Sequence, residues 1–221
     1  MKLLEALRAF PGNYEIHITV AIDGAAELAR FEGFCAAHGA KALVIQLSNG
    51  ETPRQPMLSL RLKAEPEAVA QRIEGLAAAL VADGFSLLRL KVEADIRNAN
   101  IPRGNREGHG LPGYFEHHLR LRLPLDLELA PLAAELKRFD GHLSANALIK
   151  DLGGFQERYV TQRFYGVGLN FATQQLERLL SYCSERALSV TRRIQEYIVY
   201  DSDIGLDRGW IENRAETAKN K

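Results

Sequence analysis

Cysteine, tryptophan and methionine are scarce in this chain of 221 residues, which has two Cys, one Trp and two Met. Cys35 and Cys183 each stand among apolar residues of a helical pattern. We therefore expect two buried thiols that form neither a disulfide nor a metal site. The metal-binding patterns HExxH and paired CxxC do not occur either, so no motif of this kind assigns a cofactor.

Net charge and long apolar runs are also lacking. The 28 Lys and Arg residues equal the 28 Asp and Glu residues, whereas affinity for a nucleic-acid backbone comes from clustered cations. No apolar run approaches the roughly 18 residues of a membrane span, and MKLLEALRAF predicts a short amphipathic helix instead of a signal peptide. We expect a cytoplasmic protein that contacts no membrane and whose main function is not nucleic-acid binding.

The predicted elements occur twice in the same order. In the first half, periodicity predicts two helices and four strands, the strands lying at 14–20, 41–47, 57–63 and 85–95. Their order, βαββαβ, is that of a ferredoxin-like module. Four stretches of the second half repeat the first half in sequence order; FEHHLR, for example, repeats the Glu-x-His of EIHITV.

The expected fold class is therefore α+β, a tandem duplication of the ferredoxin-like βαββαβ module. It would have two four-stranded antiparallel sheets with helices on one face of each. The predicted domains are an N-terminal helix (1–11), a first repeat (12–97), a linker (98–112), a second repeat (113–203) and a C-terminal tail (204–221).

Polar side chains gather on the predicted open face of each sheet, away from the helices. Successive strand residues point to opposite faces, so alternation assigns a face to every position. Both repeats carry Glu-x-His on the first strand, Ser/Thr-x-Arg on the third and Arg-x-x-x-Glu on the fourth. The candidate site residues so assigned are Glu15, His17, Thr19, Ser59, Arg61, Arg89, Glu93, Glu116, His118, Arg120, Thr161, Arg163, Arg192 and Glu196. The same faces also carry Lys63, Lys91 and Tyr165. We expect the two faces to turn toward one shared cleft; the alternative is that water covers each face.

These residue types favour chemistry on an anion. His17 and His118 suit general acid–base catalysis, because imidazole titrates near neutral pH. The arginines suit phosphate or carboxylate, which a guanidinium binds through forked hydrogen bonds. The Ser and Thr hydroxyl groups add hydrogen-bond donors. The glutamates are predicted as supporting residues of the same site. The set predicts a phosphoesterase-like hydrolase whose substrate is a small anionic molecule or an RNA end.

The sequence HITV at 17–20 resembles the His-hydrophobic-Thr-hydrophobic motif of the two-histidine phosphoesterases. Proteins of that family are bilobal, and each lobe carries one such motif on a strand. The resemblance implies that His17 acts on a cyclic phosphate or an RNA end and that Thr19 binds phosphate. In the second repeat, His118 is followed by Leu and Arg120, so the motif lacks its hydroxyl there.

Three alternatives remain open. No cofactor is expected, but a divalent metal has a candidate His2Glu2 site formed by Glu15, His17, Glu116 and His118. Alternatively, the two modules bind an anionic ligand or RNA without catalysis, although Tyr165 is the one aromatic residue placed for base stacking on the central strands. In the third alternative they form a scaffold whose charges pair with one another. Neither the substrate nor the oligomeric state follows from the sequence.

Overall fold

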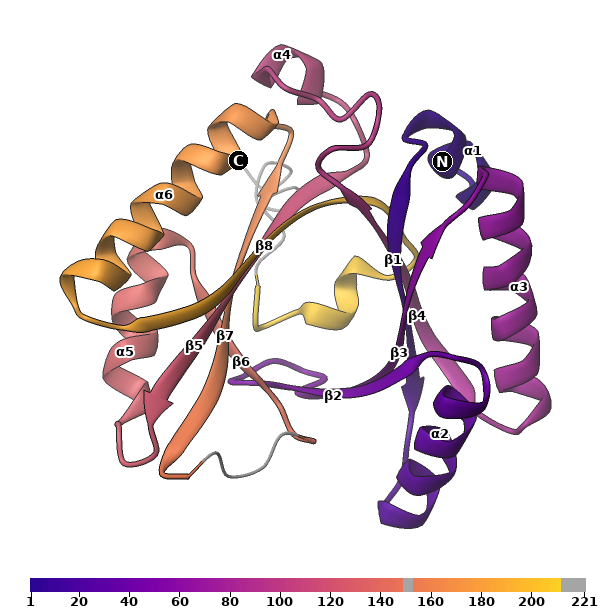
Figure 1. Ribbon diagram of the computed structural model, residues 1–221, viewed down its shortest axis with the longest axis horizontal. Coiled ribbons are helices and arrows are strands. Elements are labelled where there is room, and N and C mark those ends of the chain that lie inside the picture. Colours follow the sequence, from indigo (N-terminus) through magenta and orange to yellow (C-terminus); the bar gives the residue numbers. More distant parts are fainter. Residues whose placement is uncertain (149–152, 212–221) are drawn as a thin grey trace.

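The structure is a computed structural model that describes residues 1–148 and 153–211 (Figure 1). The first half consists of α1 (Leu3–Ala9), β1 (Asn13–Ala21), α2 (Ala25–Ala37), β2 (Lys41–Leu47), β3 (Arg54–Lys63), α3 (Pro66–Ala82) and β4 (Ser86–Asp95). A short helix, α4 (Asn105–Gly108), lies between the halves. The second half consists of β5 (Tyr114–Pro124), α5 (Leu129–Leu136), the 3-10 helix η1 (Lys137–Phe139), β6 (His142–Asn146), β7 (Phe155–Tyr165), α6 (Leu169–Glu185) and β8 (Ser189–Asp201), and the 3-10 helix η2 (Ile204–Asp207) follows.

The eight strands form one closed antiparallel barrel in the order β1-β3-β2-β6-β7-β5-β8-β4. The α+β class and the antiparallel pairing are as expected, with β1 and β3 central in the first half and β5 and β7 central in the second. The prediction of two separate four-stranded sheets is wrong, because β2 pairs with β6 and β4 pairs with β8. Each outer strand of one half supplies backbone donors and acceptors to an outer strand of the other, which removes the exposed edges of both sheets.

The strand registers of the two halves coincide. The matching cross-strand pairs are Glu15–Arg61 and Glu116–Arg163, Glu15–Glu93 and Glu116–Glu196, and His17–Ser59 and His118–Thr161. Residues that share a face of one half therefore have counterparts on the same face of the other half.

The helices cover the outside of the barrel, with α2 and α3 beside the first half and α5 and α6 beside the second (Figure 1). The outward apolar residues of β1, Ile16, Ile18 and Val20, are buried in this outer core. The same core cluster includes Phe115 and Tyr197 of the second half, so it joins the two halves. None of the described helices is long and apolar enough to cross a membrane.

The segment after β8 turns back over the barrel interior (Figure 1, yellow). Its Asp207 is buried, with 3% of its surface exposed. Trp210 and Ile211 pack with Leu47 in a small cluster of their own, and the Trp210 indole N–H donates to the carbonyl oxygen of Leu143 at 3.0 Å. This segment therefore covers part of the interior and contributes side chains to it.

Candidate functional site

The barrel contains a cavity of about 570 Å³ that both charged and apolar side chains line. Strands of both halves and the C-terminal segment line it. The predicted residues on its wall are Glu15, His17, Thr19, Ser59, Arg61, Arg89, Glu93, Glu116, His118, Thr161, Arg163, Arg192 and Glu196. Because the wall is closed, the two polar faces that alternation assigned separately become the inside of one barrel.

Arg120 is the predicted residue that lies outside this cavity. Its Nε donates to the hydroxyl of Thr191 at 3.0 Å, and its Nη1 lies 3.6 Å from Glu157. Thr19 holds the equivalent position of the first half and does line the cavity. The pairing with the fourth strand shifts register directly after both positions, and the longer arginine side chain reaches polar partners on the neighbouring strands β8 and β7.

A buried carboxylate holds His17 in place. Nε2 of His17 lies 3.1 Å from Glu93. Burial by itself raises the pKa of Glu93, but His17 and Lys91 outweigh burial and hold this pKa well below its usual value. Glu93 is therefore an ionised acceptor and Nε2 is the donor. Nδ1 of His17 is buried and has no hydrogen-bond partner among the described residues, so in the neutral ring it carries a free lone pair.

His118 occupies the equivalent position on β5 but has different partners. Its Nδ1 lies 3.0 Å from the hydroxyl oxygen of Thr161. Its Nε2 lies 3.6 Å from Glu116 and 3.9 Å from Glu196. The His118 side chain is 23% exposed and the His17 side chain 11%, so His118 is the more accessible of the two from the cavity.

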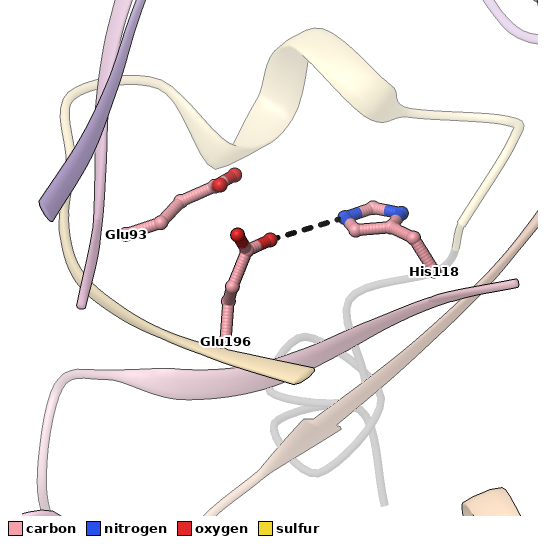
Figure 2. A group of neighbouring side chains, drawn as sticks. All are labelled: Glu93, His118 and Glu196. Atoms are coloured by element: carbon pink, nitrogen blue, oxygen red, sulfur yellow. Dashed lines mark ion pairs between the residues drawn. The ribbon is translucent and has the colours of Figure 1, made fainter. Parts of the chain in front are cut away.

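Glu93, His118 and Glu196 point toward one another inside the barrel (Figure 2). One ligand atom from each lies within 4.8 Å of the others. Burial, followed by the negative charges of Glu93 and Glu15, raises the pKa of Glu196 well above its usual value. Two carboxyl groups and an imidazole are also ligands that suit a divalent metal.

The alternative metal set raised by the sequence does not gather in this way among the described residues. Of its four residues, Glu15, His17, Glu116 and His118, this cluster of the described residues contains His118 alone. The difference arises because the closing β4–β8 seam brings Glu93 and Glu196 beside the first strands of both halves.

Lys91 links the two halves across the interior. Its Nζ lies 2.8 Å from Glu93 and 2.7 Å from Glu116, and Glu116 also accepts a hydrogen bond from Arg163 at 2.8 Å. Burial would raise the pKa of Glu116, but Lys91 and Arg163 hold it well below its usual value. Alternation places Lys91 on this face, although it was not among the predicted site residues. Ile194 holds the matching position in the second half.

Asp207 of the C-terminal segment lies between Arg89 and Arg163. Its Oδ2 accepts hydrogen bonds from Arg89 at 2.9 Å and from Arg163 at 2.6 Å, and its Oδ1 accepts from Gln55 at 3.0 Å. Burial would raise the pKa of Asp207, but the two arginines lower it to about 2. Asp201 binds the other side of Arg89. The sequence carries no signal for Asp207, because it lies beyond the last strand and only the return of the chain places it here.

Arg61 and Arg192 are exposed arginines in the cavity lining. Arg61 pairs with Glu15 at 2.6 Å, and its side chain is 62% exposed; Arg192 is also exposed. Both residues line the main cavity and an adjoining hollow of about 440 Å³. Ser59 donates a hydrogen bond to Glu15 at 2.7 Å. These two arginines are therefore placed to meet an anion that enters from solvent.

The fold and the site define an α+β protein with a closed antiparallel barrel and a charged interior. No model of a known protein family matches the chain, and no curated protein matches its sequence. Among solved structures, the small subunit of acetolactate synthase from Thermotoga maritima shares 14% identity at a TM-score of 0.32, over 86% of this chain and 95% of that chain. A mutant chlorite dismutase from Candidatus Nitrospira defluvii shares 11% identity at a TM-score of 0.31, over 92% of this chain and 96% of that chain. Similarity at this level assigns no function.

Proposed function

We propose that the protein is a hydrolase that acts on a small phosphate-bearing molecule inside the barrel, with His17 as general base and His118 as general acid. The observation that carries this proposal is the His17–Glu93 pair, whose buried Nδ1 has no hydrogen-bond partner among the described residues. A buried polar atom without a partner costs free energy. Water or substrate bound in the cavity would supply the missing partner.

In the proposed reaction, Nδ1 of His17 removes a proton from a water molecule, and the water oxygen attacks phosphorus. The bond between phosphorus and the leaving oxygen breaks, and His118 donates a proton to that oxygen. Glu93 orients the His17 ring and stabilises the imidazolium that forms, as the carboxylate of other catalytic His–acid pairs does. Arg61 and Arg192 bind the phosphate as it enters.

The size of the cavity and its place inside the barrel support a small substrate. Its volume of about 570 Å³ lies within the range of roughly 300–1,000 Å³ that is common for small-molecule sites. A cavity inside a barrel admits a small molecule or the end of an RNA chain, whereas sheets that bind an RNA strand present an open face to it.

A second candidate function is a non-catalytic protein that binds an anionic ligand or RNA, or acts as a scaffold. The specific observation in its favour is that the buried arginines already have carboxylate partners, Arg89 with Asp201 and Asp207 and Arg163 with Glu116 and Asp207. Interior charges that pair with one another need no substrate to compensate them. Turnover distinguishes the two candidates.

The test is a screen of 2′,3′-cyclic nucleotides and other phosphodiesters, with the wild type and with His17→Gln and His118→Gln. We expect each substitution to lower kcat by roughly 10²–10⁴. The double variant should lose little more than either single variant, because groups that act in one step fail together. Glutamine keeps much of the polar volume, and circular dichroism checks that each variant folds.

His38→Gln is the matched control, because His38 lies at the end of α2 and its ring stacks on Phe34, outside the cavity. It should retain wild-type activity. Turnover that survives both cavity substitutions would exclude this pair as acid and base. Turnover that a chelator abolishes, and that Glu196→Gln also removes, would favour a metal reaction at Glu93, His118 and Glu196 instead.

A further inference from the structure

The carboxylate of Asp207 lies where two buried arginines converge. The Asp207 side chain is 4% exposed, Arg89 is 5% exposed and Arg163 is 1% exposed. One carboxylate oxygen accepts a hydrogen bond from each arginine, an arrangement that also suits a phosphate oxygen. The carboxylate is thus bound as an anionic ligand would be, although it belongs to the same chain.

Asp207 is an acidic partner that Arg89 and Arg163 share. When Asp207 leaves, Arg89 keeps Asp201, Arg163 keeps Glu116, and Lys91 keeps Glu93 and Glu116. The guanidinium N–H groups that donate to Asp207 then lose that acceptor, and an unsatisfied buried donor is costly. Another anion that entered the cavity would replace the lost acceptor.

The C-terminal segment is held in a way that permits its release. Trp210 and Ile211 pack with Leu47 in a small cluster that is separate from the two larger cores. The segment's one helical turn, η2, is a 3-10 turn. Segments with few buried apolar contacts open at a lower free energy than the core does. Displacement of this segment therefore does not require the barrel to unfold.

We propose that Arg89 and Arg163 form a binding site for a phosphate group, and that Asp207 fills this site until a phosphate-bearing ligand displaces the C-terminal segment. The inference deepens the proposed function, because it names where the phosphate of the substrate binds after entry. The choice of a phosphate-bearing ligand rests on the proposed hydrolase function. The segment covers the cavity in the absence of ligand and leaves when the ligand competes for the arginines.

The chain's single tryptophan reports this displacement directly. Trp210 is 7% exposed in the docked segment, so its release into water shifts its fluorescence emission to longer wavelength. The experiment is a titration of the full chain with inorganic phosphate and with pyrophosphate, at constant ionic strength, with acetate as the carboxylate control. We expect a saturable shift with phosphate and pyrophosphate.

Two substitutions weaken the segment in different ways. Asp207→Asn removes the competing charge and should lower the Kd for phosphate about tenfold. Gly50→Ala places a Cβ 3.1 Å from the Arg208 carbonyl oxygen and 3.3 Å from Trp210 Cβ, at a φ of +120°. It loosens the segment without changing any charge, so it should also lower Kd. Asp203→Asn is the matched control, because Asp203 is exposed in the same segment, and its Kd should equal that of the wild type.

A wild-type emission spectrum that phosphate does not change, together with an unchanged Kd in Asp207→Asn, would overturn the inference. An equal response to acetate would show a site for carboxylates and would also overturn the choice of phosphate. The assay needs no turnover. Phosphate binding without catalysis supports this inference and counts against the hydrolase. Catalysis without a Trp210 response supports the hydrolase and counts against this inference.

Discussion

Arg163 and Arg61 hold equivalent positions on β7 and β3, but their surroundings differ. The Arg163 side chain is 1% exposed and contacts Glu116 and Asp207. The Arg61 side chain is 62% exposed and pairs with Glu15. Removing one partner of a buried pair leaves an uncompensated charge, whereas water screens an exposed pair. The same residue type is thus enclosed by carboxylates in one half and open to solvent in the other.

We therefore expect Arg163→Ala to lower the free energy of unfolding by about 3–5 kcal/mol and Arg61→Ala by about 0–1 kcal/mol. Urea denaturation of both variants under the same conditions measures the difference. Equal losses would mean that the Arg163 network is screened by water in solution. If Arg61→Ala keeps its stability but loses affinity for phosphate, the exposed arginine acts on the ligand.

Close packing of the linker against α6 depends on glycine. A Cβ on Gly168, the residue before α6, would lie 2.4 Å from the Arg103 carbonyl oxygen and 2.4 Å from the Gly104 carbonyl carbon. Both are backbone atoms and have little room to move. Gly75, within α3, has no atom within 4 Å of its Cβ position. A side chain is therefore excluded at Gly168 and accommodated at Gly75.

From this contrast we expect Gly168→Ala to lower the free energy of unfolding by about 1–3 kcal/mol through overpacking. Gly75→Ala should raise it by about 0.5–1 kcal/mol, because alanine has the higher helix propensity. Chemical denaturation of the two variants checks both signs. A stabilising Gly168→Ala would show that the linker does not pack on α6 in solution.

The two halves share both their barrel wall and their larger core. Strand pairs β2–β6 and β4–β8 close the wall between them, and Phe115 and Tyr197 of the second half belong to the core cluster of the first. Neither half alone would satisfy the edges of its outer strands. The halves therefore depend on each other for stability.

Thermal unfolding should accordingly be a single cooperative transition, although the sequence predicts two repeats. Differential scanning calorimetry measures this directly: the calorimetric enthalpy should equal the van't Hoff enthalpy. Two resolved transitions would instead mean that 12–97 and 113–203 are independent domains.

Local periodicity was sufficient to predict which side chains share a face. Residues two apart on a strand point the same way whatever the strand pairs with, so Glu15 and His17 were assigned to one polar face from the sequence alone, and both line the cavity. The same rule placed Arg120 there too, and it failed because alternation gives a direction but not the reach of a long side chain or the partners at the barrel's end.

The sequence by itself determined the order of the elements, the polar face of each strand and the residue types that recur in the two halves, because each depends on neighbours only a few positions apart. Tertiary structure decided that the two faces enclose one cavity. The backbone hydrogen bonds that join β2 to β6 and β4 to β8 are made by groups common to all residues and leave no pattern in the side chains. It also decided the position of Asp207, whose binding by Arg89 and Arg163 depends on the return of a segment that no periodicity describes.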